Sequence, residues 1–402
     1  MLRLREIKME RVYIVSGCRT PIGTMGGCLS SIPSARLGTI VVKEAIRRAG
    51  ITPDQVEEVF MGNAIQAGGK PNVARQVLIN SGIPIESPAT TVNVLCGSGL
   101  HSINLAARMI RMGDRDIVAA GGCENMSAAP YLIQKGRYGY RMGAGTIEDS
   151  MIYDALNDAF YDYHMGITAE NIAEQWQLTR EELDACAVSS QNKCERARKE
   201  GRFKDEIVPV EVKTRKGVMT VTEDEGPRDG VTMETISGLK PAFKKDGVVT
   251  AANSSGINDG AAAVILMSER KVKELGLQPM AEWVYGDIAG VDPQIMGIGP
   301  VRATRAVFEK TGYSIEDIDL IEANEAFAAQ SVAVAKELHF DMEKVNVNGG
   351  AIALGHPLGC SGARILVTLL YEMQKRDAKK GLATLCVGGG LGVAALVSRD
   401  FE

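Results

Sequence analysis

One histidine and two cysteines of this chain each lie in a glycine-rich stretch. His356 falls within residues 348–362, Cys96 falls within residues 93–99, and three glycines follow shortly after Cys386. Glycines allow the backbone to turn sharply or to approach another group closely. A histidine can change its charge near neutral pH, which suits it to proton transfer. A thiol and an imidazole that meet in space can carry out nucleophilic acyl transfer.

The surroundings of the two cysteines predict different roles. Cys96 lies between a predicted strand at 91–95 and a predicted helix that begins near Ser98. The amides and dipole of a helix N-terminus stabilise a thiolate, so we expect Cys96 to be a nucleophile. The alternative is a small buried apolar residue. Cys386 is predicted at the end of a strand, where free backbone amides could bind an oxyanion. Its alternative role is that of a cysteine in a strand core.

Asn324 and His164 are weaker candidates. Asn324 follows a predicted strand at 318–321, at the carboxyl end where open α/β sheets bind ligands. Its amide could position a water or a carbonyl oxygen, or it could cap a turn. His164 precedes residues 168–171, which are predicted to start a helix, and alone it would be a structural histidine. No chemical role is expected for the remaining histidines and cysteines, His101, His339, Cys18, Cys28, Cys123, Cys186, Cys194 and Cys360.

Part of the sequence occurs twice. Residues 45–63 and 306–324 both predict a helix, a glycine stop, a polar helix start, a short strand and a final asparagine. Residues 98–122 and 361–390 then both predict a helix that opens with Ser-Gly, followed by a strand that ends in glycines. The chain is therefore expected to contain two similar α/β halves.

The duplication predicts both the architecture and the site. Alternating strands and helices favour mostly parallel sheets covered by helices. We expect a first half at 1–126 that is completed by 251–277, an inserted loop domain at 127–250, and a second half at 278–402. Cys96 and the bend at His356 fall near equivalent turns of the two halves. An interface related by a pseudo-twofold axis would bring them together.

Composition narrows the class of protein. A chain of 402 residues with 45% hydrophobic and 24% charged residues is typical of a globular protein with two or three domains. Eight cysteines without a C-x-x-C pair favour neither a disulfide framework nor a metal site. The N-terminus resembles no secretory signal, so we expect a cytoplasmic protein. Residues 382–397 carry almost no charge, but their glycines favour a buried strand pair over a membrane span.

The net charge of −5 gives no general reason to bind nucleic acid. An anionic ligand would need a local basic patch, for which the candidates are Lys213, Arg215, Lys216 and Arg228. A solvated surface loop explains the same four residues equally well. No nucleic-acid or membrane partner is therefore expected.

Seven motifs together are more specific than any one of them. They occupy residues 93–99, 122–127, 164–171, 252–263, 324–327, 349–362 and 386–390. In this order they resemble the thiolase family over nearly the whole chain, from about Arg11 to Ser398. The sequence His164-Met165-Gly166 is most like the short-chain, biosynthetic branch. Two departures are mild, since Val94 stands where a basic residue is common and Cys123 where methionine is usual.

The resemblance implies a layered αβαβα fold and a reversible Claisen condensation of two acetyl-CoA molecules into acetoacetyl-CoA and CoA. Cys96 would attack an acyl-CoA thioester while His356 takes its proton. Cys386 would then remove a proton from the second acetyl-CoA. Asn324, through a water, and His356 would form one oxyanion hole, and the amides of Cys96 and Gly388 would form the other. This chemistry requires no metal or other cofactor.

The resemblance also implies how CoA thioesters bind. Arg228 would lie near the adenine of CoA and Ser255 against its pantetheine arm. The acyl pocket would be lined by bulky side chains, His164, Met165, Leu156 and Phe327. Family members are usually homotetramers built as dimers of dimers, so oligomerisation is expected here.

Three other functions remain open. A degradative 3-ketoacyl-CoA thiolase would use the same catalytic residues on longer acyl chains. A condensing enzyme that acts on acyl-carrier protein would lack a second catalytic thiol, so Cys386 argues against it. A non-catalytic carrier of acyl-CoA or lipid would be expected to lose Cys96 or His356, and this chain has both.

Overall fold

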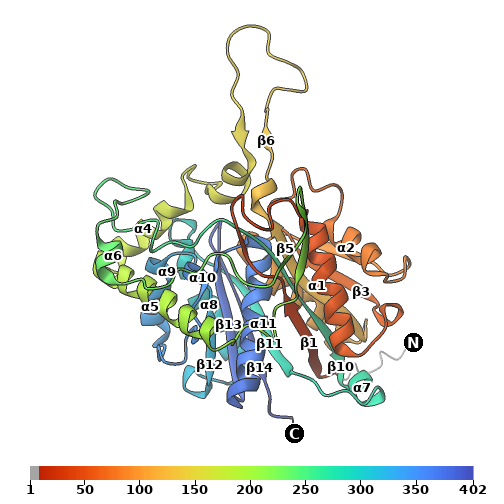
Figure 1. The fold of residues 1–402 in the computed structure, drawn as a ribbon. Coiled ribbons are helices and arrows are strands. Elements are labelled where there is room, and N and C mark those ends of the chain that lie inside the picture. Colours follow the sequence, from red (N-terminus) through yellow and green to blue (C-terminus); the bar gives the residue numbers. More distant parts are fainter. Residues whose placement is uncertain (1–8, 402) are drawn as a thin grey trace, which may run out of the picture.

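The computed structural model describes residues 9–401, and its core is one mixed β-sheet (Figure 1). Its strands run in the order β12-β13-β14-β11-β1-β10-β5-β3-β4, and the short β2 pairs with β10. The strands are β1 Val12–Arg19, β2 Gly23–Thr24, β3 Glu58–Gly62, β4 Ala89–Val92, β5 Ile117–Asn125, β10 Asn258–Ser268, β11 Ala281–Gly290, β12 Leu320–Ala323, β13 Lys380–Val387 and β14 Leu391–Ser398.

The sheet consists of two halves that meet at β1 and β11. Only Tyr13 with Glu282 and Ile14 with Ala281 pair across this junction. The expectation of mostly parallel sheets is wrong, because only β3–β4, β3–β5 and β12–β13 are parallel. β14 folds straight back from β13 through a tight turn, which forces an antiparallel pair. β10 likewise runs antiparallel to β5, its neighbour in the sheet.

Helices form three layers around the two half-sheets, as the αβαβα expectation requires. α1 (Ser34–Ala49) and α2 (Val73–Ser81) cover the outer face of the first half, and α8 (Gly299–Thr311) covers that of the second. Between the halves lie α3 (Ser98–Met112) and α11 (Leu358–Arg376), which contact strands of both. α11 is buried over almost its whole length because apolar surface faces it from both sides.

The predicted repeat is visible in the backbone. α1 and α8 end at Gly50 and Gly312, whose φ angles of 70° and 75° are left-handed. Thr52 and Ser314 then cap single 3₁₀ turns, η1 (Pro53–Gln55) and η6 (Ile315–Asp317). β3 and β12 follow, each ending just before an asparagine. The two segments are therefore the same structural unit.

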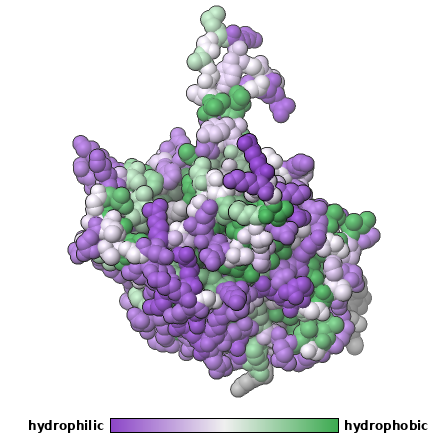
Figure 2. All heavy atoms as spheres, viewed as in Figure 1, coloured by the Kyte–Doolittle hydropathy of each residue, from purple (hydrophilic) through white to green (hydrophobic). Residues whose placement is uncertain are grey.

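Residues 126–257 connect β5 to its sheet neighbour β10. They contain β6 Tyr131–Leu132, β7 Glu148–Asp149, α4 Met165–Gln175, α5 Arg180–Lys199, β8 Val210–Thr214, β9 Gly217–Val221 and α6 Met233–Ser237. β6 and β7 form the base of a hairpin that protrudes from the body (Figure 1), with apolar residues along it (Figure 2). Within the part of the chain described, no helix is long and apolar enough to cross a membrane.

The remaining α-helices of the described residues are α7 Glu269–Glu274, α9 Ala328–Leu338 and α10 Ala351–Leu354. Several predicted boundaries shift. β4 ends at Val92, short of the predicted 91–95, and α11 begins at Leu358 rather than at the Ser-Gly pair of 361–362. β5 continues through Gly121 and Gly122 to Asn125 instead of stopping there. A Cβ on Gly122 would lie 1.8 Å from the oxygen of Gly359, so this glycine permits close packing rather than a turn.

Candidate active site

Cys96 lies in a strained turn that leads into α3. The turn η2 (Leu95–Gly97) begins at Leu95, which has an unusual φ of 46°. The half-buried Cys96 sulfur accepts a hydrogen bond from the amide of Gly388. Burial nevertheless raises the pKa of Cys96 to about 11, and the amide bonds only partly offset it. Burial therefore outweighs the effect of the helix N-terminus, so the thiol needs a base such as the one expected in His356.

His356 is held as a neutral base. Its Nδ1 lies 2.6 Å from the hydroxyl of Ser361, which also donates to the carbonyl of Pro357 at 2.9 Å. With the hydroxyl proton on Pro357, Nδ1 donates to Ser361 and Nε2 keeps the lone pair. Nε2 is buried and has no hydrogen-bond partner among the described residues. Burial, aided by Arg364, lowers the pKa of His356 to about 3, so the ring is neutral at physiological pH.

The N-termini of α3 and α11 cross with glycines at the contact. A Cβ on Gly99 would lie 2.8 Å from both the amide of Ala363 and the carbonyl of Gly359. A Cβ on Gly362 would lie 2.5 Å from the amide of Leu100. The turn of Cys96 also packs against α11 and β13. The pseudo-twofold interface thus brings the segments of Cys96, His356 and Cys386 together.

Cys386 is completely buried near the end of β13. Burial raises its pKa, and negative charge on nearby Cys96 would raise it further. Beyond it, Gly389 and Gly390 have φ angles of 78° and 85°, which shape the turn to β14. This turn presents the amide of Gly388 to the Cys96 sulfur. The two thiols are therefore neighbours in one site.

Asn324 follows β12 and faces the same imidazole. Its Nδ2 lies 3.3 Å from Nδ1 of His356. Its Oδ1 is buried without a partner among residues 9–401. A buried polar atom of this kind is costly unless something binds it. The oxygen of Asn324 is therefore placed to accept a hydrogen bond from a water beside His356.

The expected acyl-pocket residues gather around Cys386. Met165 and Phe327 share one buried apolar cluster with it. His164 caps α4 by accepting from the amide of Gly166, so the cap predicted at 168–171 starts earlier. Its ring stacks on Phe243 with centroids 4.7 Å apart, and Phe243 meets Phe327 edge-on at 6.0 Å. The part-buried Leu156 packs with Cys96 in an adjoining cluster.

A cavity of about 610 Å³ leads toward His356. It is lined by Arg228 near the surface and by Gly355, the neighbour of His356. Ser254 and Gly256 line it, whereas the hydroxyl of Ser255 donates to the carbonyl of Ala326 at 3.0 Å. The other basic candidates, Lys213, Arg215 and Lys216, are on the β8–β9 hairpin and do not line this cavity. Arg228 is the member of that group suited to a ligand here.

Comparison with known proteins agrees with this geometry. The family models for the thiolase N-terminal domain and C-terminal domain match residues 12–270 and 277–399. The chain belongs to the thiolase family. It is 58% identical to an acetyl-CoA acetyltransferase of Syntrophomonas wolfei, covering 96% of this chain and 99% of that one. It is 56% identical to an acetyl-CoA acetyltransferase of Pseudomonas aeruginosa, over 98% of this chain and 100% of that one.

Solved thiolase structures superimpose closely on this one. The acetyl-CoA acetyltransferase of Bacillus anthracis has a TM-score of 0.96 and 47% identity, covering 98% of this chain and 100% of that one. The human mitochondrial 3-ketoacyl-CoA thiolase has a TM-score of 0.94 and 43% identity, covering 97% and 99%. Proteins named acetyl-CoA acetyltransferase and 3-ketoacyl-CoA thiolase thus both occur among its structural relatives.

Several residues of this thiolase site were missed in the sequence. Ser361 and Asn258 contact the ring and the amide of His356, respectively. Ser361 lies in the motif at 349–362 and Asn258 in the motif at 252–263. A polar residue within a glycine-containing motif was therefore the available signal. Phe243 lies outside every motif, so the sequence contains no signal for it. Glu124 is fully buried in β5 beside Gly359, and its place inside the motif at 122–127 was the available signal.

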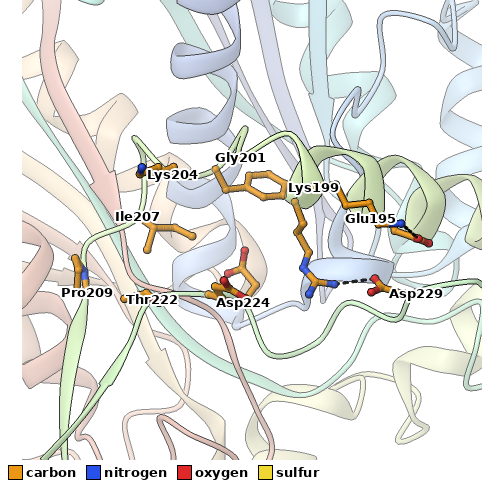
Figure 3. A pocket seen from close by; sticks show the side chains of 12 residues that line it. Glu195, Lys199, Gly201, Lys204, Ile207, Pro209, Thr222, Asp224 and Asp229 are labelled. Atoms are coloured by element: carbon orange, nitrogen blue, oxygen red, sulfur yellow. Dashed lines mark hydrogen bonds and ion pairs between the residues drawn. The ribbon is translucent and has the colours of Figure 1, made fainter.

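Two further cavities lie away from the thiols. One of about 640 Å³ lies beside α5 and is crossed by the Arg198–Asp229 ion pair at 2.9 Å (Figure 3). Another of about 660 Å³ separates α5 from α9. Neither is lined by a predicted site residue. No group of side chains within residues 9–401 is arranged to hold a metal ion.

Proposed function

We propose that this thiolase is an acetyl-CoA acetyltransferase, which condenses two acetyl-CoA molecules through an acyl-Cys96 intermediate. The names of its relatives at 58% and 56% identity support this assignment. The observation that carries the mechanism is the hydrogen bond from the Gly388 amide to the Cys96 sulfur, which joins the segments of the two thiols. His356, with its unpartnered Nε2, belongs to the same site.

The first half-reaction transfers an acetyl group to Cys96. The Cys96 proton moves to Nε2 of His356 as the sulfur attacks the thioester carbon. The amides of Cys96 and Gly388 stabilise the oxyanion that forms. The C–S bond to CoA then breaks, and the CoA thiolate takes a proton from Cys386. Free CoA leaves, and Cys386 remains as a thiolate.

The second half-reaction forms the carbon–carbon bond. The Cys386 thiolate removes a proton from the methyl group of a second acetyl-CoA. Because burial raises the pKa of Cys386, its thiolate is a stronger base than an exposed one. The carbanion attacks the acetyl group on Cys96, while Asn324, through a water, and His356 stabilise the negatively charged oxygen. The Cys96 sulfur then leaves and recovers its proton from His356, which closes the cycle without a metal or other cofactor.

Short acyl chains suit the pocket. A Cβ on Gly388 would lie 2.7 Å from the terminal methyl of Met165, so this side chain closes the space beside the catalytic turn. The rings of His164, Phe243 and Phe327 form a continuous row nearby. A degradative thiolase for longer chains would need room there, because each buried methylene contributes about 0.8 kcal/mol.

We also propose that Arg228 and the segment of Ser255 hold CoA along the cavity that leads to His356, and that the protein is a homotetramer. The protruding hairpin supports an assembly. It exposes Tyr138 and Met142, which are 93% and 96% accessible. Exposed apolar side chains that gather on one projection are typical of protein–protein contacts.

The decisive experiment compares thiolysis of acetoacetyl-CoA and of a ten-carbon 3-ketoacyl-CoA, with free CoA as the acceptor. We expect a higher kcat/KM for acetoacetyl-CoA. A higher value for the long substrate would assign the protein to the degradative branch with the same catalytic residues. Brief incubation with acetyl-CoA should leave an acetyl mass on the Cys96 peptide. Label on Cys386 instead would reverse the roles of the two thiols.

A further inference from the structure

The duplication creates a second, chemically different counterpart of the thiol pair. In the first half Val59 pairs with Ala119, and in the second half the equivalent Leu320 pairs with Gly381. Starting from Ala119 in β5 and from Gly381 in β13, the fifth residue further along is Glu124 and Cys386, respectively. A buried carboxylate therefore occupies the place in the first half that the second thiol occupies in the other.

The helices show the same correspondence. Ser98 and Ser361 open the equivalent helical motifs, so the residue two before each, Cys96 or Gly359, is also equivalent. Cys96 lies beside Cys386, and Gly359 lies beside Glu124. The pseudo-twofold axis thus relates the two thiols to a glycine and a glutamate. This second pair has no nucleophile.

Glu124 is bound on both oxygens by N–H groups. One oxygen accepts from the Asn63 side chain at 2.7 Å and the amide of Ile65 at 3.2 Å. The other accepts from the amides of Ala64 at 2.9 Å and Gly359 at 2.8 Å. Glu124 is fully buried, and no ion pair to it occurs among the described residues. Burial raises the pKa of Glu124 to about 7, and the N–H donors on its two oxygens favour the ionised form.

Gly359 transmits this contact to the active site. It lies in the first turn of α11, three residues after His356. A Cβ on Gly359 would lie 2.8 Å from the Glu124 carboxylate and from the Cα of Asn63. On the opposite side its carbonyl packs against Gly99 at the start of α3. Glu124 therefore ties the start of α11 to the first half, which also carries Cys96.

We propose that Glu124 is a positioning residue whose carboxylate, through Gly359, holds His356 at the separation from Cys96 that proton transfer requires. The effect of Glu124 on the rate of acetyl transfer rests on the proposed function. The geometric consequence does not, because reaction of Cys96 with a simple alkylating agent needs the same proton transfer to His356. Glu124 touches neither substrate nor thiol in this role.

The test follows alkylation of Cys96 by iodoacetamide between about pH 7 and 9, where Glu124 is largely ionised, located by peptide mass, in a Cys386→Ala background. With Glu124 intact, base assistance by neutral His356 should make the rate nearly independent of pH. Glu124→Gln keeps the shape but turns an amide group toward N–H donors. It should lower the rate at pH 7 on the order of 10²-fold. The rate should then rise about tenfold per pH unit as the thiolate fraction grows, as in His356→Ala.

Glu372→Gln is the control for loss of a buried carboxylate in general, since Glu372 at the far end of α11 pairs with Arg202 and Arg376 and accepts from Asn348. It should lower the melting temperature without changing the pH profile. A folded Glu124→Gln protein with the flat profile of the parent would overturn the proposal, whatever its melting temperature. If that variant does not fold, Glu124→Asp decides by the same profile, because the shorter side chain cannot reach both Asn63 and Gly359. Failure of the proposed function would show separately, as absence of acetoacetyl-CoA turnover in the parent enzyme.

Discussion

The two thiols of the site have different surroundings. Cys96 is half-buried and accepts the amide of Gly388, whereas Cys386 is completely buried among apolar side chains. Burial raises the pKa of both, so each is a protonated thiol at rest. A protonated nucleophile needs a neighbouring base, and His356 is neutral and available. Cys386 can act as a base only after it has given up its own proton, which places its step second.

Replacement of Cys386 should separate the two half-reactions. Cys386→Ala should still form acetyl-Cys96, since His356 serves that step, but it should fail to condense the second substrate. Loss of a general base typically costs about 10²–10⁴-fold in rate. Single-turnover acylation by mass spectrometry and acetoacetyl-CoA formation by absorbance measure the two steps. An equal loss in both would disprove a dedicated role in the second step.

Acylation should be insensitive to mild acid. The pKa of His356 is lowered from 6.5 to about 3, so the imidazole stays neutral down to about pH 5. The rate of acetyl-Cys96 formation should therefore change by less than about twofold from pH 8 to 5, as measured by quenched flow. A midpoint near 6.5 would show that the ring is solvated. Since the unfolded chain binds this proton first, the stability that His356 contributes above pH 6.5 is lost as the pH falls toward 3.

At the scale of helices and strands, the regular elements were predictable and the glycine-rich ones were not. The helix expected to open at Ser98 is α3, and the strand pair expected at 382–397 is β13 with β14. Apolar spacing along the chain is enough to locate such elements. Gly121 and Gly122 were interpreted as a strand end, yet β5 runs through them. Glycine permits both a turn and close packing, and only the three-dimensional neighbours distinguish these uses.

The candidate site was predictable where one motif contains the whole signal. Cys96, His356, Cys386 and Asn324 each stand in a recognisable local sequence, and the structure brings their segments together. Glu124 was missed because its significance depends on Gly359, which is far away along the chain. The raised pKa of Cys96 was not predictable for a related reason. Local sequence shows the helix N-terminus but not the depth of burial.

The contact between α3 and α11 should not tolerate a single methyl group. Gly99→Ala would place a Cβ 2.8 Å from backbone atoms of Gly359 and Ala363, which cannot move independently. Overpacking of this kind costs about 1–3 kcal/mol, so the free energy of unfolding in urea should fall by that amount. Condensation activity should fall as well, because both helices begin at the site. Gly238→Ala is the control, since nothing lies within 4 Å of a Cβ there; an equal effect of both variants would contradict this account.

At the scale of the whole molecule, the exposed hairpin should carry the assembly. Tyr138→Asp combined with Met142→Asp would put charge on its two most accessible apolar residues. We expect the molar mass from light scattering to fall from that of a tetramer to that of a smaller species. Val218→Asp, on the β8–β9 hairpin and 62% accessible, is the matched control. An unchanged mass in the double variant would remove the hairpin from the interface.

The central position of α11 has a consequence for biosynthesis. This helix covers strands β5 and β10 of the first half, although it is encoded near the end of the chain. While a ribosome is still translating the middle of the message, the first half-sheet has α3 but lacks α11, the other part of its inner cover, and exposes apolar surface. Nascent chains with such surface are prone to aggregate. Productive folding therefore waits until translation is nearly complete, and an mRNA truncated before the codon for Leu358 would yield an aggregating product rather than half an enzyme.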